Sequence, residues 1–296
     1  MNREEFLFGE VGRRCAAWLY RPSDPGARPP CVVMAHGLGA VRAMGLDSYA
    51  SRFADAGMAV LVFDYRGFGD SEGEPRQVVD IDSQLRDWAA AVDCARRFPG
   101  VDGTRIALWG TSFSGGHVLT LAARDPRFAA VVSQVPYLGL PARRGLPRGH
   151  TIRLALSALR DRARAVVRVR PLLLQTIGEP GSRAFLREAG AEEKFRSLLA
   201  PGASWHNTVA ARVVLGLPRY RPGDQAADVE CPLLLCACEN DAITPLAPVA
   251  EAALAAPRAE LCSYQGEHFD IYRGPVFDRA VTDQIRFLRR HLTLPA

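Results

Sequence analysis

The 296-residue chain has no apolar run as long as the roughly 18 residues that cross a bilayer. Its opening residues include Arg3, Glu4 and Glu5, where a secretory signal would have an apolar core. We therefore expect a cytoplasmic protein without membrane insertion.

Cysteines with the spacing of a metal or redox motif are also missing. The seven cysteines are an odd number, and no two of them have Cys-x-x-Cys spacing. Cys236 and Cys238 are two residues apart in an apolar run, so their side chains share one face of an expected strand. This pattern favours buried, reduced thiols, and no metal site is expected.

A cluster of positive charge is missing as well. The net charge of +5 arises almost entirely from arginine, and the arginines are spread along the chain. A nucleic-acid-binding surface would concentrate them, so no nucleic-acid partner is expected. The composition, with 48% apolar and 23% charged residues, is that of a globular protein. The length suits one large α/β domain with an insertion, or two domains.

Short apolar runs alternate with amphipathic stretches along most of the chain. Strands are expected at residues 6–9, 14–20, 31–35, 58–63, 106–109, 129–135, 232–238 and 259–264, and helices at 47–57, 81–95, 117–123, 246–256 and 277–288. Such alternation is typical of a parallel sheet with helices on both faces.

The alternation stops between residues 137 and 224, where apolar residues recur at helical spacing and no convincing strand intervenes. We expect helices here, including residues 185–199 and 209–215. The predicted organisation is a core of residues 1–136 and 225–296 with a helical lid at 137–224. The lid would supply the substrate-binding residues, and its apolar surface could support a homodimer.

The arginines and histidines of the lid are expected to be non-catalytic. Its first helix carries Arg153, Arg160, Arg162 and Arg164, which indicate a solvated face, with attraction of an acidic or coenzyme-linked substrate as the alternative. His150 and His206, which also lie in the lid, are expected to be surface or packing residues.

The stretch from residue 106 to 116 reads Ile-Ala-Leu-Trp-Gly-Thr-Ser-Phe-Ser-Gly-Gly and predicts a strand, a tight turn and a helix with Ser112 at the turn. A serine hydroxyl needs exposure, a nearby base and donors for the oxyanion in order to act as a nucleophile. Gly110 and Ser114 flank it as small residues, although Ser114 departs from the pattern Gly-x-Ser-x-Gly. The amide of Phe113 begins the following helix and can face the oxyanion.

A second glycine-rich loop, His36-Gly37-Leu38-Gly39, follows the strand at 31–35, and its amides can bind an oxyanion. Ser71, in the loop at 64–71, is not the expected nucleophile because no helix begins directly behind it. Asp64 and Arg66 are expected to hold that loop in place.

Two further candidate residues follow late strands. Asp241 comes after the strand at 232–238 and His268 after the strand at 259–264, while Glu239 is the alternative acid on the same turn. Because ends of parallel strands converge at one edge of a sheet, Ser112, Asp241 and His268 can meet there. His268 would act as the base and Asp241 would orient it, with the amides of Leu38 and Phe113 as the oxyanion hole.

The chain resembles the α/β-hydrolase superfamily over nearly its full length. The matching segments are the loops at 36–39 and 64–71, the Ser112 turn, Asp241 before Ile243-Thr244-Pro245, and residues 266–272. The turn and the His-Phe-Asp-Ile-Tyr ending are similar to those of esterases, thioesterases, dienelactone-hydrolase-like and proline-peptidase-like enzymes. The resemblance implies a mostly parallel eight-stranded sheet and a serine hydrolase without a cofactor, with Ser112, Asp241 and His268 matching the triad.

The expected reaction is hydrolysis of a carboxylic ester or thioester of a small-molecule acyl substrate. Amide cleavage, acyl transfer and carbon–carbon bond hydrolysis on the same triad are the alternatives, and the lid would decide among them. A non-catalytic binding protein with the same fold is disfavoured because the triad and the oxyanion loop are intact.

Overall fold

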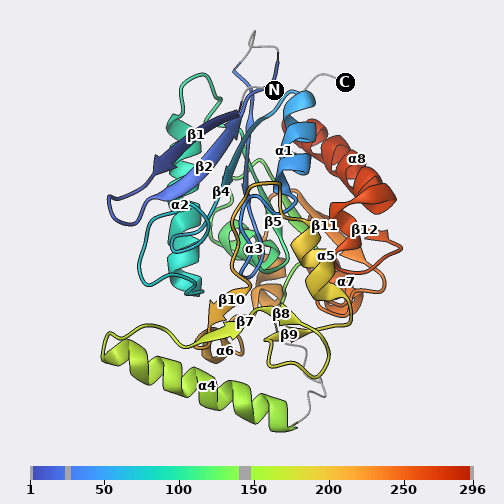
Figure 1. Ribbon diagram of the computed structural model, residues 1–296. Coiled ribbons are helices and arrows are strands. Elements are labelled where there is room, and N and C mark those ends of the chain that lie inside the picture. Colours follow the sequence, from blue (N-terminus) through green and yellow to red (C-terminus); the bar gives the residue numbers. More distant parts are fainter. Residues whose placement is uncertain (1–2, 24–27, 140–147, 294–296) are drawn as a thin grey trace.

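A central sheet organises the structure, a computed structural model that describes residues 3–23, 28–139 and 148–293 (Figure 1). The sheet has eight strands in the order β1-β2-β4-β3-β5-β6-β11-β12. These are β1 (Arg3–Phe8), β2 (Cys15–Tyr20), β3 (Cys31–Ala35), β4 (Ala59–Phe63), β5 (Ile106–Thr111), β6 (Ala130–Gln134), β11 (Leu233–Cys238) and β12 (Ala259–Tyr264). β1 and β2 join antiparallel at one edge, and all pairings from β4 to β12 are parallel. The expected mostly parallel eight-stranded sheet is confirmed.

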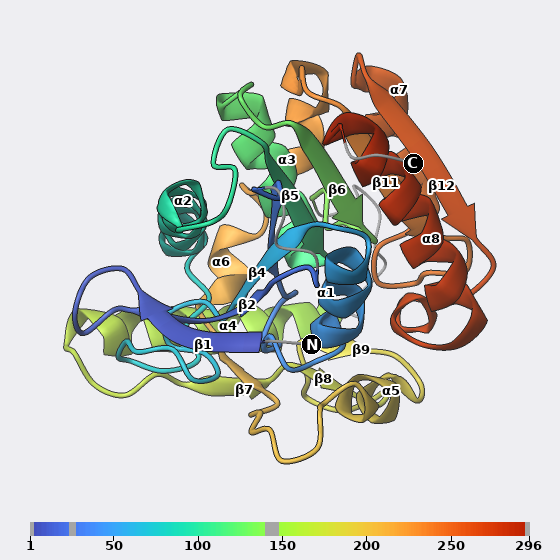
Figure 2. The same ribbon diagram turned by 90° about the horizontal axis from the view of Figure 1, so that it is seen from above.

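Helices cover both faces of the sheet (Figure 2). One face packs against α2 (Ile81–Arg97), α3 (Phe113–Arg124) and α7 (Leu246–Ala255), and the other against α1 (Leu46–Asp55) and α8 (Gly274–His291). Strands buried on both faces are apolar at every position rather than at alternate positions, which explains the continuous apolar runs of β3, β4 and β5. None of the helices in the described part of the chain is long and apolar enough to cross a membrane.

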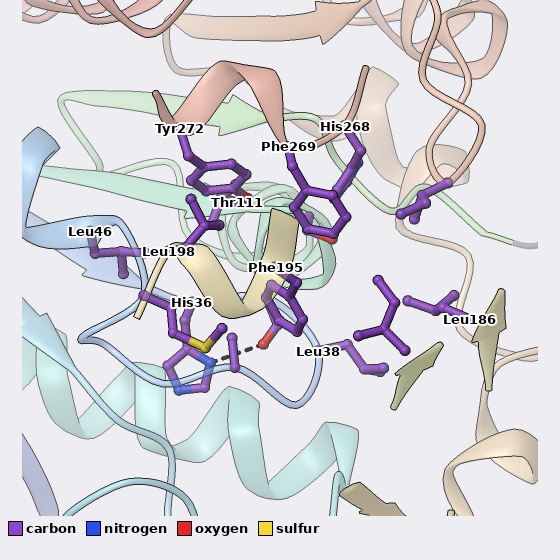
Figure 3. A pocket seen from close by; sticks show the side chains of 16 residues that line it. His36, Leu38, Leu46, Thr111, Leu186, Phe195, Leu198, His268, Phe269 and Tyr272 are labelled. Carbon is purple, nitrogen blue, oxygen red and sulfur yellow. Dashed lines mark hydrogen bonds between the residues drawn. The ribbon is translucent and has the colours of Figure 1, made fainter. Parts of the chain in front are cut away.

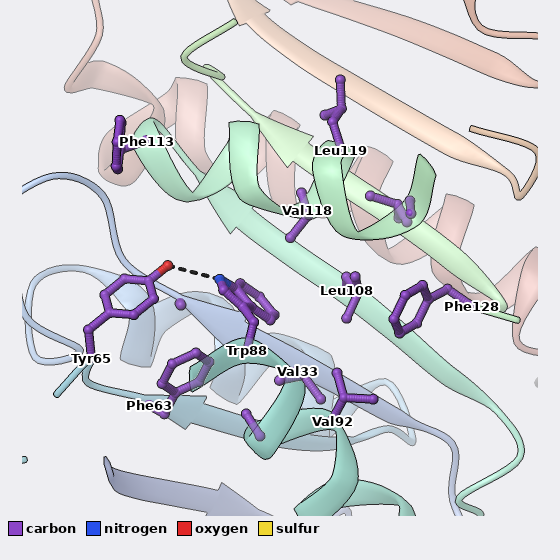
Figure 4. Packing of buried hydrophobic residues seen from close by; sticks show 14 of the residues in the cluster. Val33, Phe63, Tyr65, Trp88, Val92, Leu108, Phe113, Val118, Leu119 and Phe128 are labelled. Carbon is purple, nitrogen blue, oxygen red and sulfur yellow. Dashed lines mark hydrogen bonds between the residues drawn. The ribbon is translucent and has the colours of Figure 1, made fainter. Parts of the chain in front are cut away.

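Alternate residues of the strands face opposite layers. Val33 and Leu108 pack with Trp88 of α2, as Figure 4 shows, whereas Val32 and Trp109 belong to the core beneath α1 and α8. Both cores are filled with large apolar side chains, which hold the strands and their carboxyl ends in fixed positions.

The segment between β6 and β11 differs from the expected helical lid. Its elements are α4 (Arg148–Val166), β7 (Leu173–Gln175), β8 (Ile177–Gly178), β9 (Leu186–Arg187), α5 (Ala191–Ser197), β10 (Thr208–Ala210), α6 (Val213–Gly216) and the 3₁₀ helix η1 (Pro222–Asp228). β7 pairs with β10 and β8 with β9, so the prediction that no strand intervenes is wrong. Strands of two or three residues show no recognisable alternation. The predicted lid residues 140–147 lie outside the described ranges, and the boundaries 137 and 224 stay a prediction.

The inserted segment lies over the loop that follows β3. Trp205 donates its Nε1 hydrogen to the carbonyl oxygen of Gly39 at 2.7 Å, and the amide of Ala200 donates to the carbonyl of Ala43 at 2.9 Å. These contacts connect the insertion to the loop that carries Leu38.

The loop after β4 is fastened by buried charges. The carboxylate of Asp64 accepts from the backbone N–H of Arg42 at 2.6 Å and from its guanidinium, and both side chains are buried. Arg66 donates from Nε to Asp87 of α2 at 2.6 Å. Asp64 and Arg66 thus have the structural role expected for them.

Ser71 is also part of this fastening. Its buried hydroxyl accepts from the amide of Ala16 at 2.8 Å and donates to the carbonyl oxygen of Asp64 at 2.7 Å. It therefore connects β2 to the loop after β4.

Replacing Ser71 by alanine should lower the free energy of unfolding by about 1–3 kcal/mol, because two buried backbone groups lose their partner. Urea unfolding followed by circular dichroism measures the change. Ser48→Ala, on an exposed position of α1, is the matched control and should change stability little. An unchanged free energy of unfolding in Ser71→Ala would contradict the structural role.

Candidate active site

Ser112 stands at the turn between β5 and α3 in a backbone conformation that serine rarely adopts, with φ 55° and ψ −118°. Such strain persists only where the surroundings hold it. The Ser112 amide donates to the carbonyl of Gln134 at 2.8 Å, and its carbonyl accepts from the amides of Gly115 at 2.9 Å and Tyr137 at 2.8 Å. β6 and the chain after it therefore fix the turn.

Close packing around the turn explains its small residues. A Cβ on Gly110 would overlap the carbonyl oxygen of Ser114. Ser114 is fully buried, and its hydroxyl hydrogen-bonds that of Tyr65 at 2.8 Å, which in turn accepts from Trp88 Nε1 at 2.9 Å (Figure 4). The departure from a second glycine thus adds a polar link between α3, the loop after β4 and α2.

His268 and Asp241 meet beyond the ends of β12 and β11. His268 Nδ1 is 2.6 Å from Asp241 Oδ2, and both side chains are buried. The other oxygen of Asp241 accepts from the amides of Ile243 at 2.8 Å and Thr244 at 2.7 Å. Burial alone would raise the pKa of Asp241, but the His268 imidazole and the bonds from Thr244 outweigh it, so this pKa is lowered. The carboxylate is held ionised against His268.

Glu239, the alternative acid, lies elsewhere on the same turn. Its exposed carboxylate accepts from Ser263 Oγ at 3.1 Å and from the side-chain nitrogen Nε2 of Gln265. The structure brings Asp241, rather than Glu239, to His268.

Ser112, His268, Gly37 and Leu38 line one pocket (Figure 3). A Cβ on Gly37 would lie 2.9 Å from the Cβ of Ser112, so only glycine allows the loop after β3 to pass so close to the serine. His36 Nδ1 hydrogen-bonds the carbonyl oxygen of Gly37 at 2.9 Å and holds this loop. Within the part of the chain that the structure describes, Ser112 and His268 are not hydrogen-bonded to each other.

The inserted segment closes the other side of the pocket with Ile177, Leu186, Phe195 and Leu198. Phe195 of α5 stacks on Phe269, with ring centroids 5.3 Å apart, directly beside His268. The cavity that Ser112 lines has a volume of about 30 Å³, so the apolar side chains of the insertion leave little room beside the serine.

The family Hydrolase_4, described as serine aminopeptidase S33, matches residues 27–268. The chain belongs to the α/β-hydrolase superfamily. As a member, it is an enzyme of a hydrolase family.

Relatives of this α/β hydrolase carry diverse names. It is 42% identical over 278 residues to the quorum-quenching protein AidA of Acinetobacter baumannii, covering 94% of this chain and 91% of the relative. It is 37% identical over 143 residues to the thiohydrolase aneE of Aspergillus aculeatus, covering 46% and 44% of the two chains. Its fold is similar to the crystal structure of the α/β hydrolase GrgF from Penicillium, with a TM-score of 0.85, 25% identity, and 99% and 100% of the chains covered.

The sequence did not predict every residue of the α/β-hydrolase site. The hydroxyl of Thr244 donates to Asp241 Oδ2 at 2.7 Å and lies 3.2 Å from His268 Nδ1. An aspartate in a turn often bonds the backbone amide two residues on, which indicates the bond from Ile243 to Asp241 but not the hydroxyl of Thr244. The pocket residues of the insertion gave no such signal beyond their place in the predicted lid.

His117 is a further buried polar residue, one helical turn behind Ser112 in the α/β-hydrolase core. Its Nδ1 is 2.6 Å from the hydroxyl of Tyr220 and its Nε2 is 2.9 Å from Gln84 Oε1. Burial, with a smaller contribution from His36, lowers the pKa of His117 to about 3. The imidazole is therefore neutral in the folded protein.

Acid should destabilise the protein through His117. Its ordinary pKa is 6.5, so the unfolded chain takes up a proton as the pH falls below that value while the folded chain does not. Well above pH 6.5 His117 is neutral in both the folded and the unfolded chain and does not lower the free energy of unfolding. On going to about pH 5, the free energy of unfolding should fall by about 2 kcal/mol. Urea unfolding at both pH values measures this, and His117→Gln should flatten the dependence. An equal dependence in that variant would contradict the assignment.

Proposed function

We propose that this α/β hydrolase cleaves a carboxylic ester or thioester of a small to medium organic substrate through an acyl-enzyme on Ser112. The observation that carries the proposal is the His268–Asp241 pair, 2.6 Å apart, whose histidine lines the same pocket as Ser112 at its strained turn. These are the three roles that an activated serine requires: nucleophile, base and orienting acid.

In the proposed first step, the Nε2 atom of His268 takes the proton of the Ser112 hydroxyl as its oxygen attacks the carbonyl carbon of the substrate. The carbonyl oxygen becomes an oxyanion, for which the amides of Leu38 and Phe113 are the proposed donors. The close approach of the Gly37 backbone to Ser112 supports Leu38, and the start of α3 at Phe113 supports the second donor.

Collapse of this intermediate breaks the bond to the alcohol or thiol, which leaves with the proton from His268. Water then attacks the acyl-enzyme, gives a proton to His268, and the carboxylic acid departs as the proton returns to Ser112. Asp241 stabilises the imidazolium that forms twice in this cycle. Its two backbone donors and Thr244 keep it oriented toward Nδ1.

The pocket wall supports an apolar acyl group. Leu186 and Phe195 of the insertion and Leu38 of the proposed oxyanion loop line this pocket (Figure 3), and Ile177 lines it as well. The relative named thiohydrolase favours a thioester. Lactones are internal esters and therefore belong among the substrates tested.

Ser112→Ala, His268→Ala and Asp241→Asn should each lower kcat/KM for an activated ester about 10³-fold or more, because each removes one member of a unit. Circular dichroism and urea unfolding should show folded variants. Glu239→Gln is the matched control, since this carboxylate on the same turn does not contact His268 and its loss should leave the rate unchanged. An unchanged kcat/KM in Ser112→Ala would contradict the mechanism.

The reaction class is decided by comparing p-nitrophenyl esters, thioesters and p-nitroanilides that have the same acyl group, together with lactones of similar size. Esters, lactones or thioesters should be cleaved faster than the anilides. Faster cleavage of the anilides would favour the amide hydrolysis suggested by the family's description as an aminopeptidase.

A further inference from the structure

Helix α4 lies at the edge of the molecule, away from the central sheet (Figure 1). It contacts α6, and its outward side is apolar. Ile152, Leu156, Leu159 and Val166 are 58%, 50%, 57% and 71% exposed. Exposed large apolar residues are unusual when they gather on one helix rather than stand singly.

The apolar residues form one stripe. Ile152, Leu156, Leu159, Ala163 and Val166 follow one another at intervals of four, three, four and three residues. With about 100° of rotation per residue, these positions lie within about 40° of one helix line. The buried residues Leu154, Ala158 and Asp161 lie on the opposite side. The stripe therefore points away from the body of the protein.

A buried ion pair fixes this rotation. Asp161 is fully buried and accepts from Arg212 Nε at 2.7 Å and Nη2 at 2.9 Å, and from the amides of Arg212 at 2.9 Å and Leu172 at 2.8 Å. Three donors of Arg212, directly before α6, and the amide of Leu172, directly before β7, thus hold one side of α4 inward. Turning the apolar stripe inward would break all four.

Charge on this surface has one sign. Exposed arginines flank the stripe on both sides of α4 and continue after it: Arg153, Arg160, Arg162, Arg164, Arg168 and Arg170. Between residues 149 and 173 the one acid is Asp161, which is buried against Arg212. An apolar stripe with Arg153, Arg160 and Arg164 along one side and Arg162 on the other is typical of helices that lie in the interface of an anionic membrane.

The same charges disfavour a second copy of the chain on this face. The intervals of four and three residues would suit a helix pair, but the flanking positions hold Arg153, Arg160 and Arg162. Packing two such helices antiparallel would place Arg153 and Arg160 of one copy beside those of the other, and either orientation would bring two faces of the same charge together. An anionic lipid surface instead complements both the stripe and its flanks.

We propose that the face of α4 formed by residues 152–166 docks the protein on anionic phospholipid bilayers. Docking of this kind buries one helix side at the level of the head groups and leaves the rest of the protein in water. Because α4 belongs to the insertion that lines the active-site pocket, it would hold that insertion at the membrane surface.

Flotation with phosphatidylglycerol or phosphatidylcholine vesicles tests the docking. The wild type should bind phosphatidylglycerol vesicles at least about tenfold more tightly than phosphatidylcholine vesicles, and about 0.5 M salt should remove most of the difference. Leu156→Gln/Leu159→Gln should lower binding to phosphatidylglycerol at least about tenfold through loss of the apolar stripe. Arg160→Gln/Arg164→Gln should mainly lower the preference for phosphatidylglycerol.

Leu254→Gln is the matched control, because Leu254 is 89% exposed on α7, outside the stripe, and its replacement should leave vesicle binding unchanged. Hydrolysis of a soluble ester by all variants confirms that they are folded. Absent binding at low salt, or equal binding to both vesicle types, would overturn the proposal. A dimer in sedimentation that Leu156→Gln/Leu159→Gln dissociates, without vesicle binding, would also overturn it and assign the face to a second copy.

Discussion

The left-handed backbone at Ser112 is the constraint on which the site depends. Its φ of 55° turns the chain sharply from β5 into α3, so the serine leaves the sheet's edge while its neighbours remain buried. Three backbone hydrogen bonds to Gln134, Gly115 and Tyr137 stabilise this turn. Gly110 accommodates it on one side, and Gly37 brings the proposed oxyanion loop against it on the other.

Parallel strands bring the remaining parts together. β5, β11 and β12 end at the same edge, so residues more than a hundred positions apart in the chain share one pocket. Interactions away from the pocket keep its walls in place. The Asp64–Arg42 ion pair holds the loops after β3 and β4, and a hydrogen bond from Trp205 to Gly39 connects the insertion to the loop after β3. The insertion places the apolar side chains of Ile177, Leu186, Phe195 and Leu198 in the pocket that Ser112 lines, so it is the proposed selector of the acyl group.

The core of this architecture could be predicted because its strands are buried on both faces. β3 and β12 have the predicted bounds, and the other core strands differ by a few residues. The insertion could not be predicted equally well, since β8 and β9 have two residues each and depend on pairing rather than on pattern. In the site, Asp241 and Glu239 looked alike in sequence, and only the fold placed Asp241 against His268. The bonds of Ser114 and His117 depend on distant residues that no local pattern indicates.

The most direct test of the central claim is covalent labelling with a fluorophosphonate, followed by mass spectrometry of the labelled peptide. An activated Ser112 should form the adduct in the wild type, and the Ser112→Ala protein should remain unlabelled although it retains the buried Ser71 and Ser114. An adduct on any other serine, or none on folded wild-type protein, would contradict the account.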